Sequence, residues 1–370
     1  MSGAIDDIEA FHVRVPLPCP LRLGQMMIPD REYVIVKIRD EDGQIGWSYG
    51  LGRNAPVAET ISRTITPIWR GRKLDEHDAF YKLAVQSNVC LGTNGIFWRA
   101  LSLCDCALYD LLAKRENKTL AEYLGGTLRS VPCMLAGGYP LPDESPQSLA
   151  EEIEQMAAQQ PVSIKIASTT DYQRDTDRLR LARKHAGDTP LMIDLFWTAD
   201  PVEPLIRAAT EWRDLGIGWL EDPVPFDHYE EAAQLARATG LPIAIGDEQS
   251  GRRQFDRLMQ EAKVAVVRLD ATVCGGVRAF LQIAQAAADR GLEVACHVFH
   301  HVHTQLACVA TNVRCVEQFP TSLGLDSIHE LWKSDLSIRN GSLHPDATAS
   351  CGVGYLWDES AITRCRIEPS

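Results

Sequence analysis

The segment GWLEDPVPF, residues 218–226, ends an apolar run in two adjacent carboxylates and then places two prolines at alternate positions. Proline cannot donate to a sheet ladder, so the apolar run is predicted to be a buried strand that stops at Glu221 and Asp222. A lone carboxylate at the end of a buried strand is costly unless another group compensates its charge. The reason for placing two there must therefore lie elsewhere in the chain.

The segment is one of a series, because from about residue 130 short apolar runs alternate with amphipathic helical stretches. Eight strand candidates occur: VPCMLA, VSIKIA, PLMIDL, IGWLED, PIAIGD, VAVVRLD, LEVACHV and RCVEQF. Strand–helix alternation predicts a parallel sheet, and eight such units favour a closed barrel. An open doubly wound sheet is the alternative, but no GxGxxG or P-loop motif supports a nucleotide site.

The first 126 residues have a different organisation. Residues 32–50 alternate apolar and polar side chains around the turn sequence EDGQ, which predicts an antiparallel hairpin. Helical patterns follow at 57–71, 76–85 and 95–117, and Leu-Gly-Gly at 124–126 ends the block. We therefore expect an α+β domain over 1–126 and a barrel over 127–343. The aperiodic segment 344–370 is expected to pack back on the first domain.

Composition narrows the class of protein. The 37 basic and 50 acidic residues give a net charge of −13, which argues against a nucleic-acid or membrane surface. No apolar run reaches the roughly 18 residues of a membrane span, and the N-terminus lacks the pattern of a signal peptide. The eleven cysteines include no CxxC pair, so reduced thiols in the cytoplasm are expected. We also expect a homo-oligomer that acts on a small molecule.

Ionisable residues recur at the carboxyl ends of successive predicted strands. The strand-end ring consists of Lys165, Asp194, Glu221, Asp247, Asp270, His297 and Glu317. Their spacings of 29, 27, 26, 23, 27 and 20 residues each match one strand–helix unit, so the side chains should meet at one mouth of the barrel. A single member could be a helix cap, but seven in step indicate a site. Asp194, Glu221 and Asp247 offer the oxygen ligands that Mg²⁺ prefers.

The order of residue types in this ring resembles the enolase superfamily, specifically its mandelate racemase-like branch. The stretch ALYDLLAKRENKTLAEYLGG is similar to the end of that family's capping domain, and WLEDPVP to its fourth-strand signature. The resemblance implies an α+β capping domain over a modified (β/α)7β barrel and one Mg²⁺ ion. It further implies abstraction of the proton α to a carboxylate.

Two bases are implied by the resemblance. Lys165 matches the second lysine of a family Lys-x-Lys pair, and its pKa should be lowered by a nearby Mg²⁺. Ser163 replaces the first lysine and could only hydrogen-bond to substrate. His297 matches the family base, and Asp270 could accept a hydrogen bond from its other ring nitrogen. His300, His301 and His303 come later, in the loop and helix start, and are expected to be ordinary core or loop histidines.

The acidic residues leave alternatives open. The family pattern selects Asp247 over its neighbour Glu248 as the third metal ligand. Asp222 should point away from the mouth. Glu317 matches an acid that donates to a substrate carboxylate oxygen when protonated, and Phe196 stands where relatives often have asparagine.

Substrate specificity is expected to come from loops of the first domain. Arg22 and Arg53 could meet a second carboxylate or hydroxyl groups, although an arginine in such a loop is more often a solvated surface residue. The leading functional prediction is a Mg²⁺-dependent acid-sugar dehydratase that forms a 2-keto-3-deoxy acid. A racemase or epimerase, and a cycloisomerase of a sugar acid or lactone, remain open, as does a non-catalytic binding protein.

Overall fold

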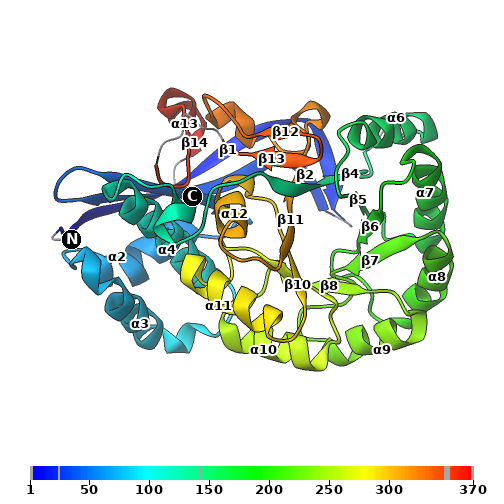
Figure 1. Cartoon of the computed structure of the whole chain (residues 1–370), viewed down its shortest axis with the longest axis horizontal. Helices are drawn as coiled ribbons and strands as arrows, with labels where there is room; N and C mark the ends of the chain where they lie inside the picture. Colours follow the sequence, from blue (N-terminus) through cyan, green and yellow to red (C-terminus); the bar gives the residue numbers. More distant parts are fainter. Residues whose placement is uncertain (1–2, 24–25, 142–143, 346–350, 368–370) are drawn as a thin grey trace.

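The computed structural model describes residues 3–23, 26–141, 144–345 and 351–367. A domain built on an antiparallel sheet lies beside a barrel ringed by helices (Figure 1). Within the described residues, no helix combines the length and apolar character needed to cross a bilayer. The predicted fold class, a modified (β/α)7β barrel with a capping domain, is confirmed.

The capping domain begins with three antiparallel strands, β1 (Ile5–Leu23), β2 (Met26–Asp40) and β3 (Ile45–Leu51). The helices that follow are α1 (Val57–Thr60), a π turn (Ile61–Ile65), α2 (Thr66–Trp69), α3 (His77–Ser87), α4 (Ile96–Arg115) and α5 (Leu120–Tyr123), with short 3-10 turns at Leu74–Glu76 and Val89–Leu91. Helix α4 is buried over most of its length because it packs against both β3 and the barrel helix α11. It therefore joins the two domains.

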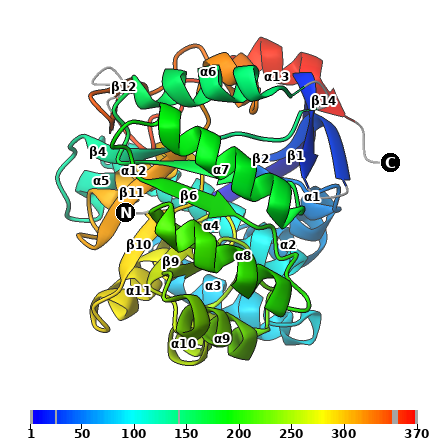
Figure 2. The ribbon, with the colours of Figure 1, turned by 90° about the vertical axis from the view of Figure 1, so that its right-hand side faces the viewer.

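The barrel strands are β4 (Val131–Gly137), β5 (Ser163–Ala167), β6 (Leu191–Asp194), β7 (Ile217–Glu221), β8 (Ile243–Ile245), β9 (Val266–Leu269), β10 (Glu293–Cys296) and β11 (Val313–Gln318). Each strand is parallel to the next, and pairing of β11 with β4 closes the barrel. The helices between them are α6 (Pro146–Ala157), α7 (Tyr172–His185), α8 (Glu203–Asp214), α9 (Tyr229–Thr239), α10 (Arg252–Glu261), α11 (Gly276–Ala288) and α12 (His300–Ala307). They form the outer layer, as Figure 2 shows for α6 to α10.

The inside of the barrel is a packed core below the catalytic end. Met134, Met192, Trp219, Val266 and Cys315 are buried there against one another, one from each of five strands. Because side chains alternate along a strand, the residues two positions further on face the same interior at the carboxyl ends. That alternation places charged side chains of the strand-end ring directly above an apolar layer.

The C-terminal segment returns to the capping domain. Strands β12 (Ser337–Arg339) and β13 (Ser342–His344) form a hairpin that adds antiparallel to β4, followed by α13 (Glu359–Cys365) and β14 (Arg366–Ile367). Strand β14 pairs with β1, and Trp357 packs on Trp47 with ring centroids 5.7 Å apart. Asp110 of α4 accepts backbone hydrogen bonds from both Trp47 and Val353, so one buried carboxylate ties the segment to the cap.

Candidate active site

A cavity of about 250 Å³ opens where the barrel strands end under the capping domain. From the strand-end ring, its wall includes Lys165, Asp194, Asp247, His297 and Glu317. Asp270 and Glu221 lie directly behind this wall, where they contact His297 and Lys165 respectively. The strand order therefore brings all seven predicted residues to one place.

Lys165 is surrounded by carboxylates. Its Nζ lies 2.5 Å from Glu221 Oε1, 2.8 Å from Glu317 Oε1 and 3.0 Å from Asp194 Oδ2. Burial alone would lower the pKa of Lys165, but these three carboxylates together raise it well above its ordinary value. Lys165 is thus an ammonium ion that joins its own strand to β6, β7 and β11, and the expectation that a nearby Mg²⁺ lowers its pKa stays a prediction.

A second group of acids lies beside Lys165. Glu221, Asp222 and Asp247 each place a carboxylate oxygen within 4.8 Å of the others. One oxygen of Asp222 and one of Asp247 are buried without a hydrogen-bond partner. Burial raises the pKa of both residues, that of Asp247 to about 6, and repulsion between the two contributes for Asp222.

The position of Asp222 corrects the prediction that it points away from the mouth. Its backbone is left-handed, with φ of 39°, whereas the prediction assumed that the strand alternation continued past Glu221. The backbone turn lets two consecutive residues turn their carboxylates toward the same point. Asp194 instead pairs with Lys165, which also contacts Glu221. The predicted ligand trio is therefore connected through Lys165, and Asp222 lies beside Glu221 and Asp247 as an added member of the cluster.

His297 is paired with Asp270 at the rim. The Nδ1 atom of His297 lies 2.9 Å from Asp270 Oδ2, and Nε2 lies 3.7 Å from Asp247 Oδ2. Burial and the positive charges of Arg268, Lys165 and Arg53 lower the pKa of His297 well below its ordinary value. Burial raises the pKa of Asp270 to about 8, although Thr272 donates two hydrogen bonds to it. The imidazole is therefore neutral at neutral pH and fit to accept a proton.

The surroundings of Glu317 favour its ionised form, and its role as a donor to a substrate carboxylate when protonated stays a prediction. Burial favours the neutral acid, but the charges of Lys165 and Arg268 outweigh it and lower the pKa of Glu317. Arg268 is fully buried on β9 and bridges Glu317 and Glu221, the latter at 3.1 Å. Its guanidinium also donates to the carbonyl oxygens of Ala295 and Cys296. Two buried cations, Lys165 and Arg268, thus compensate the negative charge of the acids at the bottom of the cavity.

Three further predicted binding residues lie in different places. Arg53 lines the cavity and pairs with Glu248 at 2.5 Å, and Glu248 also binds Arg99. Because two arginines occupy Glu248, Asp247 is the carboxylate that faces the acidic group. Arg22 is exposed on β1 and is absent from the described residues that line the cavity. Ser163 is also off the cavity wall: it lies one layer deeper than Lys165, and its buried hydroxyl has no partner.

Both domains of the chain match known protein families. Residues 6–125 match the N-terminal domain of the mandelate racemase and muconate lactonizing enzyme family, and residues 148–361 match the enolase C-terminal domain-like family. The chain belongs to the enolase superfamily, in its mandelate racemase-like branch.

Relatives in this superfamily carry several names. The chain is 27% identical to an L-talarate/galactarate dehydratase of Salmonella typhimurium, over 89% of this chain and 81% of the relative. It is 28% identical to a 3,6-anhydro-alpha-L-galactonate cycloisomerase of Streptomyces coelicolor, over 80% and 83%. A Bradyrhizobium enolase crystallised with magnesium and mandelic acid superposes with a TM-score of 0.88 at 22% identity, over 100% of this chain and 99% of that one. At this identity, the structural likeness shows that the two proteins share a fold and no more.

This member of the superfamily has an aromatic cavity wall. Phe196 and Trp197, both left-handed with φ of 51° and 59°, line it together with Tyr139, Phe299 and Phe319. Aromatic walls exclude water from the reacting groups, which strengthens electrostatic interactions among them.

Sequence reasoning missed two arginines of the site. Arg31 of β2 lines the cavity and donates from Nε and Nη2 to the carbonyl oxygen of Leu325, at 3.2 and 3.1 Å. Among the described residues, no carboxylate lies within ion-pair distance of it. No local motif marks Arg31, but Arg268 could have been found, because it stands two residues before Asp270 and shares its face of the strand.

Proposed function

We propose that this protein is a Mg²⁺-dependent dehydratase that removes the proton α to the carboxylate of an acid sugar. The observation that carries the proposal is the neutral imidazole of His297, held by Asp270, on the same cavity as Lys165 and the acidic group. The dehydratase names among the relatives support the choice of substrate class.

The acidic group fits a divalent cation. Glu221, Asp222 and Asp247 converge, and two of their oxygens are buried without a partner. Asp194, Glu221 and Asp247 would hold Mg²⁺, with Asp222 behind them, because hard oxygen ligands on neighbouring strands match its preference. When bound, Mg²⁺ would supply a Lewis acid that stabilises negative charge on the substrate carboxylate.

His297 carries out both proton transfers, with Asp270 and Lys165 in supporting roles. His297 Nε2 accepts the α-proton, and Asp270 keeps the ring oriented and the other nitrogen engaged. The ammonium of Lys165 offsets the charge that develops on the substrate carboxylate. The imidazolium of His297 then returns its proton to the departing β-hydroxyl, which leaves as water. Tautomerisation of the resulting enol gives a 2-keto-3-deoxy acid.

Arg31 is proposed to bind the end of the substrate far from the reacting carbon. Its hydrogen bonds go to one backbone carbonyl oxygen and its guanidinium lies 5.6 Å from the centre of the Phe319 ring, whereas Arg53 is already paired with Glu248. Hydrogen bonds from a charged group contribute about 1.5–3 kcal/mol. We expect Arg31→Gln to lower kcat/KM by roughly 10- to 100-fold, mainly through KM, and equal kinetics would remove Arg31 from binding.

A library of aldonates and aldarates, incubated with the protein and Mg²⁺, tests the proposal. Formation of a 2-keto acid from at least one member is expected. Exchange of the α-proton in deuterated water without keto acid would point instead to racemisation or epimerisation. Conversion to an isomer without water loss would point to a cycloisomerase, which one relative is named.

A further inference from the structure

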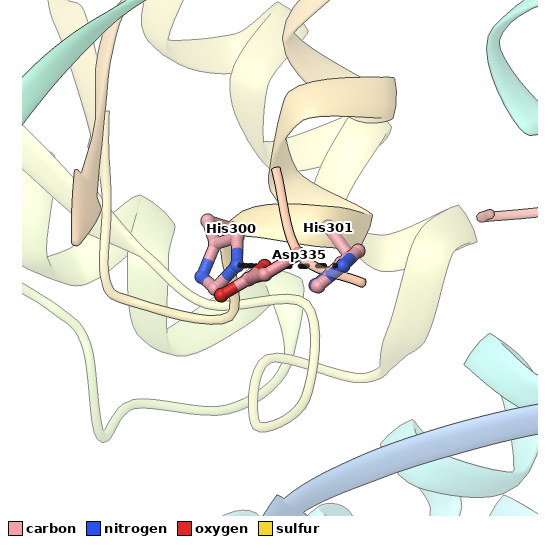
Figure 3. Close-up of side chains that lie close together, drawn as sticks. All are labelled: His300, His301 and Asp335. Atoms are coloured by element: carbon pink, nitrogen blue, oxygen red, sulfur yellow. Dashed lines mark hydrogen bonds and ion pairs between the residues drawn. The ribbon is translucent and has the colours of Figure 1, made fainter. Parts of the chain in front are cut away.

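A second cluster of potential metal ligands lies outside the catalytic group. His300 and His301, at the start of α12, both face Asp335, which precedes β12 (Figure 3). His300 Nε2 lies 2.6 Å and His301 Nε2 3.4 Å from the same oxygen, Asp335 Oδ1. All three residues are largely withdrawn from solvent, with exposures of 6% for His300 and 2% for His301.

The backbone before α12 separates this cluster from the catalytic base. Val298 and Phe299 are both left-handed, with φ of 27° and 43°. Such angles are strained for branched and bulky residues and indicate that the surroundings impose them. The turn directs His297 to the catalytic cavity, whereas His300 lines a separate, smaller one.

The donor set has the chemistry of a transition-metal site. Two imidazoles and one carboxylate suit Zn²⁺ and its neighbours in the first transition row, whereas Mg²⁺ prefers oxygen ligands. In a tetrahedral site with bonds of about 2.0–2.1 Å, neighbouring donors lie about 3.3 Å apart. The distances of 2.6 and 3.4 Å bracket that value, so small movements of the side chains would suffice.

Two observations indicate a ligand at this cluster. His301 Nδ1 is buried without a hydrogen-bond partner, and the ring packs against Trp332 and Tyr355, at centroid distances of 4.6 and 5.6 Å. A cavity of about 20 Å³ adjoins His300 and Asp335. It exceeds the roughly 10–15 Å³ that one water needs, so there is room for a fourth ligand.

Further polar groups line the same small cavity. Gln318 presents a buried Oε1 that has no partner, and His329, Asp326 and Thr321 also line the wall. A buried polar atom without a partner is uncommon in native proteins and is explained by an ion or a bound water.

We propose that His300, His301 and Asp335 form a second metal site, which takes Zn²⁺ or a similar transition-metal ion rather than Mg²⁺. The ion would join the start of α12 to the segment before β12, 35 residues further along the chain. It would stabilise the wall shared by the small cavity and the catalytic one, because Val298, Phe299 and Phe319 line both.

The test uses the full-length protein in excess Mg²⁺, which keeps the catalytic carboxylates filled. Co²⁺ is titrated in as a visible probe, and bound metal is counted after gel filtration. We expect one equivalent of Co²⁺ with the absorption of a nitrogen-ligated ion, displaced by Zn²⁺. Asp335→Asn and His300→Gln should each weaken Co²⁺ binding at least tenfold, since loss of a ligand costs more than the 10- to 100-fold of an outer partner.

The matched control is His185→Gln, which removes an imidazole paired with the exposed Glu154. It should leave Co²⁺ binding as in the parent. Absence of Co²⁺ binding to the parent would overturn the proposal, and so would equal binding by Asp335→Asn. If Asp335→Asn fails to fold, as judged by circular dichroism, His300→Gln decides alone, because its ring faces a cavity rather than the core.

Discussion

The histidines of two histidine–aspartate pairs, His297–Asp270 and His300–Asp335, lie three residues apart in the chain, but the first pair is neutral and the second is an ion pair. Their nitrogen–oxygen distances are similar, 2.9 and 2.6 Å, and all four residues are at least largely buried. Burial and nearby cations lower the pKa of His297, whereas Asp335 and Asp326 overcome burial and raise the pKa of His300. The pKa of Asp335 is correspondingly lowered, mainly by His300, against the effect of burial.

The comparison shows that a hydrogen-bonded carboxylate does not by itself determine the charge of a histidine. Three cations, Arg268, Lys165 and Arg53, act on His297, and burial leaves Asp270 itself with a raised pKa. The pair is therefore neutral and can accept a proton from substrate. The His300–Asp335 pair is an ion pair, and its imidazole has no free capacity as a base.

Replacing the two histidines separately tests this contrast most strongly. His297→Asn should lower kcat by at least about 10³-fold, because general acid–base catalysis contributes about 10²–10⁴ and this residue acts twice. The variant should retain its Mg²⁺, measured by elemental analysis, since His297 is not in the carboxylate cluster.

His300→Asn is the matched comparison and should have a much smaller effect on kcat, below about tenfold. Similar losses in the two variants would show that the contrast in charge is not what makes His297 the base. Turnover by His297→Asn at the parent's rate would remove His297 from the mechanism altogether.

Arg268 is predicted to be the residue that maintains the neutral pair and the ionised Glu317. Arg268→Met would leave Glu221 and Glu317 with Lys165 as the single nearby cation among the described residues. Breaking a buried ion pair costs about 3–5 kcal/mol. The free energy of unfolding in urea should fall by about that amount.

The matched variant for stability is Arg31→Met, which loses hydrogen bonds to one carbonyl oxygen but no ion pair. It should destabilise the protein by about 1 kcal/mol. Equal losses in both variants would contradict the importance assigned to the buried charges.

Much of this arrangement was predictable from the sequence, because it depends on regular structure. Eight strand segments, seven of them with an ionisable residue near the carboxyl end, spaced by one strand–helix unit, were sufficient to predict the barrel and to bring Lys165 and His297 to one mouth. What sequence could not supply is local backbone conformation: the left-handed residue at Asp222 turns a carboxylate toward the site that alternation had sent away.

Charge states were harder to predict than positions. Glu317 was predicted to donate a hydrogen bond when protonated, but sequence reasoning did not recognise Arg268 as an inward residue of β9, and the charge of Arg268 helps to lower the pKa of Glu317. Ser163 was expected at the substrate, yet one step of strand alternation places it a layer below Lys165. Arg31 reaches the cavity only because the capping domain covers the barrel, a contact between distant segments that no local pattern reports.

The pH dependence of kcat/KM tests directly whether the pKa of His297 is lowered. Because the pKa of His297 is lowered, the free imidazole stays neutral below pH 6.5, where an ordinary histidine would be roughly half protonated. We expect no acid limb from His297 at pH 6.5, and protonation of His297 should lower kcat/KM only at lower pH. An acid limb at or above pH 6.5 would contradict the lowered value.

The His300–Asp335 pair should instead affect how the free energy of unfolding depends on pH. Since the pKa of His300 is raised on folding, its contribution to the free energy of unfolding is complete below its unfolded pKa of about 6.5. That contribution is lost as pH rises through its pKa in the folded protein. Since the pKa of Asp335 is lowered, its contribution is complete above about 3.9 and is lost as pH falls through the folded value. Both residues therefore contribute fully to stability between about pH 4 and 6.5.

Asp335→Asn should therefore cost most at about pH 5.5 and less at pH 8.5, when metal is removed with a chelator. Because Asp335 is 22% exposed, solvent screening limits the effect to about 1 kcal/mol. Urea unfolding at the two pH values measures the difference, with Glu154→Gln, which breaks the exposed pair with His185, as the control. A cost that is the same at both pH values would mean that His300 is neutral like His297, and the two pairs would then differ in position but not in charge.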